Sequence, residues 1–145
     1  MAPSLPLQLD SQERAALRAA IASANASGAD LAAAFYEELF RLAPGARALF
    51  PADMAAQRMK LGQTLETVIA FLDEPERLEA PLRALGKRHI EYGAFAPHYL
   101  LVGEALLHSL ESAVPGGFDD STRKAWQRLY GWMAAVMLDG AAAAT

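Results

Sequence analysis

The sequence of 145 residues contains no cysteine. This absence excludes disulfide bonds, iron–sulfur clusters, zinc sites with cysteine ligands and thiolate ligation of any cofactor. A chain without cysteine suits a reducing compartment, although many exported proteins also lack it. The first nine residues have no basic segment followed by a long apolar run, so we expect no signal peptide and a cytoplasmic protein.

Excess charge of one sign and long apolar runs are also missing. The formal net charge is −4, which gives no general attraction to nucleic acid or to acidic membrane surfaces. No apolar run approaches the roughly 20 residues that a membrane-spanning helix needs. Hydrophobic residues nevertheless make up 53% of the chain, enough for a real core. We therefore predict one soluble domain over residues 1–145, with an N-terminal extension at 1–9 and a C-terminal tail at 141–145.

The signature motifs of common nucleotide-binding and hydrolytic enzymes are absent as well. The chain has no G-x-G-x-x-G, no G-x-x-x-x-G-K-[ST], no H-E-x-x-H and no G-x-S-x-G. Neighbouring carboxylates, such as Glu37 with Glu38, fall on expected helix surfaces, where a solvated role is favoured over acid–base catalysis. The chemistry must therefore come from other side chains.

What the sequence does contain is helical periodicity. Every long segment repeats its apolar residues at the helical period, and none alternates polar and apolar residues over a useful length. The first helix is predicted over 12–23, a short helical turn over 46–50, and a turn at Pro115-Gly116-Gly117. The last helix is expected to end at Gly140. The expected caps are Asp10 or Ser11, Asp30, Asp53 and Asp119 or Asp120, with Pro81 and Pro97 in first turns. The pattern predicts an all-α domain of six to seven helices of unequal length.

Three histidines are candidates for metal ligation. His98 is expected at the first turn of a helix and His108 in mid-helix, where a surface or boundary histidine is typical. His89 alone lies on an apolar stripe near a helix end, with Gly93 after it to turn the chain away. Such a histidine can present a neutral imidazole nitrogen to a metal. A lone histidine in this setting is more often a hydrogen-bonded core residue. For His89 to be a metal ligand, other residues must form the second wall of a pocket.

Two polar side chains on other apolar stripes could form that second wall. Gln57 is the one amide on the inner face of the helix predicted from Asp53 to about Leu72. Tyr36 lies at the edge of the apolar stripe of the helix predicted over 31–42. Each of them alone is typical of a structural residue. The combination of Tyr36, Gln57 and His89 favours a cofactor pocket.

The same residues carry a resemblance to bacterial single-domain globins, close to the globin module of flavohaemoglobins. The resemblance covers residues 10–140 and is strongest in the segments FYEELF (35–40), ALFP (48–51), QRMKL (57–61), LGKRH (85–89) and the HY-VGE-LL pattern (98–107). In that family a distal tyrosine, a haem-stacking phenylalanine, a distal glutamine and a proximal histidine follow one another. Here these are Tyr36, Phe50, Gln57 and His89, at separations of 14, 7 and 32 residues. The first and last separations match the family, while the middle one implies a shorter loop before the distal helix.

The resemblance implies a globin fold around haem b, with His89 as the proximal ligand to the iron. Tyr36 and Gln57 would donate hydrogen bonds to a ligand on the distal side. Further cofactor contacts are implied for Phe50, Lys60, Leu61, Arg88, Phe95 and Val102, with Lys60 and Arg88 able to reach the propionates.

One position departs from the family. In flavohaemoglobins the proximal histidine is linked through a tyrosine to a glutamate near the end of the last helix. Tyr99 matches the tyrosine, but the glutamate position falls at Ala141, beyond the expected helix end at Gly140. This departure weakens the case for strong peroxidase-like or dioxygenase chemistry.

The resulting hypothesis is a haem globin that reversibly binds O2, CO and NO and serves O2 binding, delivery or transport. One alternative is a nitric oxide dioxygenase that forms nitrate with electrons from a separate reductase, because we see no flavin or nicotinamide domain. A haem-based gas sensor is less favoured, since no output domain follows. A helical interaction module without haem and a homodimeric assembly are also left open.

Overall fold

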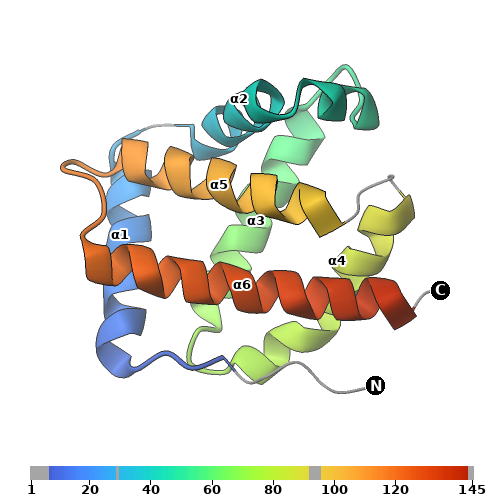
Figure 1. Ribbon diagram of the computed structural model, residues 1–145. Coiled ribbons are helices and arrows are strands. Elements are labelled where there is room, and N and C mark those ends of the chain that lie inside the picture. The colour runs from blue at the N-terminus through green and yellow to red at the C-terminus, as the bar shows by residue number, and fades with distance from the viewer. Residues whose placement is uncertain (1–6, 29, 92–95, 144–145) are drawn as a thin grey trace.

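The computed structural model describes residues 7–28, 30–91 and 96–143. In these ranges the regular structure consists of six α-helices and two short 3-10 helices, without a strand (Figure 1). The all-α class predicted from the sequence is therefore confirmed. The elements are α1 (Ser11–Ala26), α2 (Leu31–Leu42), η1 (Pro44–Leu49), α3 (Ala55–Ala70), η2 (Pro75–Leu78), α4 (Glu79–Glu91), α5 (Ala96–Ala113) and α6 (Asp120–Ala143).

Aspartates cap three of the helices, as predicted. Asp10, Asp30 and Asp119 each accept a hydrogen bond from the backbone N–H three residues later, at 2.8, 3.0 and 2.7 Å. These bonds satisfy N–H groups that the first turn of a helix leaves without partners. Asp53 instead accepts from the N–H of Ala55 at 3.0 Å, so it closes the turn that leads into α3.

The prediction that Gly140 ends the last helix is wrong. α6 continues to Ala143, and Gly140 is buried inside the contact of α6 with α4. A Cβ atom at position 140 would lie 2.3 Å from the carbonyl oxygen of Arg83 on α4. The glycine therefore permits a close approach of two helices and does not terminate one.

The helices pack around α5 and α6, which run antiparallel beside each other (Figure 1). The predicted turn between them contains Gly116 and Gly117 at φ values of 81° and 73°, which residues other than glycine rarely adopt. α2 packs on α5, α1 contacts both α5 and α6, and α4 rests on α6. No helix in the described ranges is both long and apolar enough to cross a membrane.

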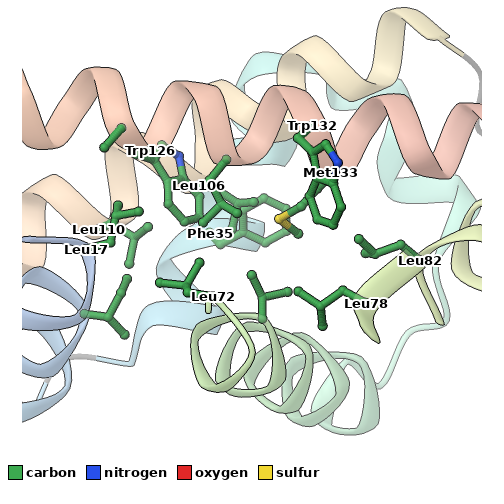
Figure 2. Close-up of a cluster of buried hydrophobic side chains, with 14 of the residues drawn as sticks. Leu17, Phe35, Leu72, Leu78, Leu82, Leu106, Leu110, Trp126, Trp132 and Met133 are labelled. Carbon is green, nitrogen blue, oxygen red and sulfur yellow. The ribbon is translucent and has the colours of Figure 1, made fainter. Parts of the chain in front are cut away.

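The hydrophobic core lies beneath α6. Figure 2 shows Trp126, Trp132 and Met133 pointing from α6 toward side chains of the other helices, among them Phe35 and Leu72. All five are buried. Burial of such large apolar side chains is the main driving force for folding and leaves α6 as a rigid base for the helices around it.

Candidate functional site

His89 lies in the last turn of α4 and is half-buried, in agreement with the sequence analysis. Its Nδ1 atom is 2.7 Å from the carbonyl oxygen of Leu85, one turn earlier. Because a carbonyl oxygen can only accept, Nδ1 carries the proton and Nε2 keeps a lone pair. Burial lowers the pKa of His89, the bond to Leu85 opposes this shift, and the charge of Arg88 adds to it. The imidazole is therefore neutral at pH 7, and its Nε2 is chemically suited to bind a metal.

Tyr99 of α5 packs beside His89, with the two ring centroids 6.1 Å apart. Its backbone carbonyl accepts a hydrogen bond from the hydroxyl of Tyr130 on α6 at 2.5 Å. The Tyr130 ring lies against Gly103, where a Cβ atom would come within 2.6 Å of the ring. Burial raises the pKa of both tyrosines. Tyr130 thus anchors the first turn of α5 beside His89.

This role of Tyr130 was not predicted from the sequence. The signal that was available is Gly103 in the VGE segment, because a glycine inside a helix often marks a close approach. Which side chain fills the space at Gly103 depends on how α6 packs on α5, and local sequence does not reveal that packing.

Replacing Tyr130 by phenylalanine should lower the free energy of unfolding by about 0.5–1.5 kcal/mol, because one hydrogen bond is lost while the ring stays against Gly103. Denaturant unfolding of both proteins at pH 7 measures the difference. Gly103→Ala should destabilise more, since the added methyl group overlaps the ring itself. Equal stability of wild type and Tyr130→Phe would show that the hydroxyl does not contribute.

No carboxylate stands at the position expected for the proximal glutamate. Ala141 lies on α6 and is 7% exposed, because the helix continues past Gly140. The nearby Asp139 is directed to α4, with its Oδ2 3.7 Å from Nη2 of Arg83. The acidic partner of the family pattern is therefore absent at Ala141, as the sequence indicated.

Tyr36 of α2 belongs to an aromatic cluster with Phe40 and Phe50. The ring centroids of Tyr36 and Phe50 are 5.5 Å apart at an interplanar angle of 71°, and those of Phe40 and Phe50 are also 5.5 Å apart. Arg47 holds the loop that carries Phe50, since it donates to the backbone carbonyls of residues 50–52 at 2.9–3.3 Å. The structure thus brings Tyr36 and Phe50 together.

The hydroxyl of Tyr36 is a donor without a hydrogen-bond partner in the part of the chain that the structure describes. The residue is half-buried, and this burial raises the pKa of Tyr36 to about 12. Gln57, in the first turn of α3, is also half-buried, and its amide forms no hydrogen bond to another described residue. Both side chains are thus able to donate to a bound molecule.

We expect Tyr36 to stay protonated until the pH approaches about 12. The folded chain holds the phenol proton more tightly than the unfolded chain, in which the tyrosine pKa is about 10. The contribution of Tyr36 to stability is therefore complete below pH 10 and falls as the pH rises toward 12. Phenolate absorbance after rapid pH jumps measures this, and Tyr36→Phe should remove a component near pH 12. Removal of a component near pH 10 instead would contradict the shift.

The other residues predicted to contact the cofactor differ in their solvent exposure. Lys60 and Arg88 are exposed, and Leu61 and Val102 are half-buried and pack against the core. Leu61 also lines a cavity of about 270 Å³ between α1, α2 and α3. Phe95 lies outside the described residues, as does Gly93.

The other two histidines lie at the expected places on α5. His98 is half-buried near the start of the helix. His108 is exposed in mid-helix, with its Nε2 3.4 Å from Oε2 of Glu38 on α2. Over residues 7–28, 30–91 and 96–143, no group of three or more His, Cys, Asp or Glu side chains could hold a metal ion.

The neutral imidazole of His89 and the half-buried apolar side chains of α3, α4 and α5 fit the haem that the resemblance implies. α3 and α4 make little contact with each other in the described ranges, although they follow each other in sequence. Leu61 of α3, Leu85 of α4 and Val102 of α5 pack against the core but stay half-buried. A flat, apolar group would complete the burial of such side chains, and a neutral imidazole is a proper ligand for its iron.

Comparisons with curated proteins point in one direction. The chain is 26% identical over 106 residues to a flavohemoprotein of Rhizobium meliloti and 25% identical over 133 residues to one of Chromobacterium violaceum. It is 31% identical over 81 residues to neuroglobin of Danio rerio. These matches cover 71%, 90% and 56% of this chain, but only 26%, 33% and 51% of the relatives. The chain therefore spans between a quarter and about half of the length of these proteins.

Solved structures and a family model complete the comparison. An engineered carbene transferase and candidate nitric oxide dioxygenase from Rhodothermus marinus has a TM-score of 0.80 at 26% identity, covering 94% of this chain and 95% of its own. A bacterial globin from Campylobacter jejuni has a TM-score of 0.78 at 20% identity, covering 92% and 97%, and supports the fold alone. The sequence model of the globin family matches residues 33–137. The chain therefore belongs to the globin family, as the resemblance predicted.

Proposed function

We propose that this globin binds haem b through Nε2 of His89 and uses it to bind O2 reversibly, with CO and NO as further ligands. The observation that carries the proposal is the neutral imidazole of His89, whose proton is held on Nδ1 by the carbonyl of Leu85. This bond fixes the tautomer and the ring orientation that metal ligation requires. Membership of the globin family, whose members bind haem, supports the choice of cofactor.

The residues of the chain have separate roles in this proposal. Bound haem would supply an iron centre that exchanges diatomic gases. Tyr36 would donate a hydrogen bond to a polar ligand, and its raised pKa keeps it a donor at all physiological pH values. Gln57 would offer a second donor from α3, and Phe50 would form an apolar wall. Together these residues stabilise a ligand and limit the access of water.

Three residues would hold the edges of the cofactor. Lys60 on α3 and Arg88 on α4 are exposed cations that can neutralise carboxylates such as the haem propionates. Val102 of α5 is half-buried and would contact the ring edge. Tyr99 would restrain the imidazole through its ring contact with His89.

Spectroscopic titration tests the proposal directly. Apoprotein mixed with haemin should bind one haem per chain and give a Soret band that shifts when CO is added to the reduced form. The band position and the equivalence point report ligation and stoichiometry. A protein that stays colourless and takes up no added haemin would refute haem binding, and with it the proposed function.

Nitric oxide dioxygenation is the second candidate function. It is favoured by the structural neighbour from Rhodothermus marinus and by the two flavohemoproteins. The reaction combines NO, O2 and one electron into nitrate, so a reductase would have to supply the electron. The alanine at the glutamate position argues against this function, because no carboxylate there can increase the basicity of the proximal ligand.

Nitrate yield separates the two functions. In the presence of a supplied reductase, a dioxygenase forms many nitrate ions per haem under continued addition of NO and O2. A protein that only stores or delivers O2 forms no more than about one nitrate per haem and then stays oxidised.

A further inference from the structure

α4, which carries His89, depends on α6 for its position. In the described ranges α6 is the only α-helix that α4 contacts extensively, and η2 joins α4 only at its start. Figure 1 shows α4 behind the C-terminal half of α6. The place of His89 relative to the core therefore depends on how closely α4 approaches α6.

Two glycines permit this approach, one on each helix. A Cβ atom on Gly86 would lie 1.9 Å from the carbonyl oxygen of Met137, and one on Gly140 would lie 2.3 Å from the carbonyl oxygen of Arg83. The contacts are reciprocal, since each glycine meets the residue three positions before the glycine of the other helix. Such backbone contact between helices allows Cα–H···O interactions.

Space, and not backbone conformation, is the reason for glycine at both positions. Neither Gly86 nor Gly140 has a positive φ, and both lie inside regular helix, where glycine is less favourable than alanine. Gly131, which also lies on α6, gives the contrast, because a Cβ atom there would meet nothing within 4 Å. Replacement of Gly86 or Gly140, unlike replacement of Gly131, would therefore force α4 and α6 apart.

We propose that Gly86 and Gly140 are positioning residues for the proximal histidine, because their contact sets the distance of α4 from α6. This inference rests on the proposed haem function. His89 follows Gly86 by three residues, less than one helical turn, and the bond to Leu85 ties its ring to the helix. A displacement of α4 at Gly86 is therefore passed on to the imidazole.

Alanine at either position should displace His89 by a measurable amount. The overlaps at 1.9 and 2.3 Å involve backbone atoms and cannot be relieved by a rotamer change, so the helices must separate by roughly 1 Å. A misplacement of about 1 Å can cost a functional site a factor of about 10². We expect Gly86→Ala to release haem about tenfold to a hundredfold faster than wild type, and Gly140→Ala to act in the same direction but less strongly.

The test uses the haem-loaded full chain and two measurements. The first is the rate of haem transfer to an excess of an acceptor apoprotein. The second is the iron–histidine stretching frequency of the reduced protein in resonance Raman spectra, which should fall in both variants. Since one separation of the helices relieves both overlaps, the double variant should show less than the product of the two single effects on the rate.

Two control variants distinguish positioning from loss of stability. Gly131→Ala makes the same chemical change on α6 in open space, and both readouts should stay at their wild-type values. Leu17→Ala creates a cavity at a fully buried core position on α1, a helix without extensive contact to α4. It should lower stability and yet leave the iron–histidine frequency unchanged.

Each outcome has a definite meaning. A wild-type protein that takes up no haem overturns the proposed function and this inference with it. A wild-type protein that binds haem, with unchanged frequencies in folded Gly86→Ala and Gly140→Ala, overturns only the positioning role. If Gly86→Ala does not fold, Gly140→Ala decides, since its overlap is smaller. If neither folds while Leu17→Ala does, the glycines are structural and the inference is wrong.

Discussion

Replacement of His89 by alanine is expected to abolish stable haem binding. In the proposed site His89 Nε2 is the one protein ligand to the iron, and its ring is oriented by the bond from Nδ1 to the carbonyl of Leu85. Loss of a residue that only supports a metal ligand typically costs about 10–100-fold in affinity, so loss of the ligand itself should exceed that range. The haemin titration described above measures the change, with circular dichroism to confirm that the helices remain.

A rescue experiment and a matched control make this prediction specific. His89→Gly should regain a wild-type-like spectrum when imidazole is added, because the free base can occupy the vacated place. His108→Ala removes an exposed histidine that pairs with Glu38 and should bind haem like the wild type. A normal spectrum and normal affinity in His89→Ala would refute the proximal assignment.

Much of the fold follows from local sequence. Aspartate caps at the starts of α1, α2 and α6 were recognisable because a short acceptor before an apolar stripe satisfies the first free N–H groups. The turn at Gly116 and Gly117 was recognisable because a run of proline and glycine favours positive φ. These features depend on a few neighbouring residues, and a single sequence therefore reveals them.

Features that depend on packing between distant segments were not predicted correctly from the sequence. Gly140 was interpreted as a helix end, which is the commoner use of a glycine after an apolar stripe. Its actual environment is the carbonyl of Arg83, a residue 57 positions earlier in the chain. The bond from the Tyr130 hydroxyl to the Tyr99 carbonyl likewise joins α6 to α5. No local pattern distinguishes a glycine that ends a helix from one that lets two helices touch.

The candidate site was predictable to a similar degree. His89 and Tyr36 were selected because polar side chains on apolar stripes are unusual, and the structure gives both of them half-buried positions and shifted pKa values. Their roles toward haem remain proposals. Lys60 and Arg88 were suggested by sequence adjacency alone, and both side chains are exposed in the structure.

Replacement of Tyr36 by phenylalanine is expected to accelerate O2 release by about tenfold to a hundredfold. The change removes only the hydroxyl, and the ring can keep its contacts with Phe40 and Phe50. A hydrogen bond to a ligand with partial charge contributes about 1.5–3 kcal/mol in a buried site, which corresponds to that range of rates. Stopped-flow displacement of O2 by CO measures the rate.

The choice of ligand and of control variants separates a hydrogen bond from a general disturbance of the pocket. CO is less polar than O2 when bound, so its release should change much less in Tyr36→Phe. Ser109→Ala removes another buried hydroxyl, which bonds to the carbonyl of Leu106 on α5, and should leave O2 release unchanged. If Gln57 shares the ligand with Tyr36, the double variant Tyr36→Phe/Gln57→Val will deviate from the product of the single effects. An unchanged O2 release rate in Tyr36→Phe would mean that the hydroxyl donates elsewhere, and the stabilisation of the ligand would then have to come from Gln57.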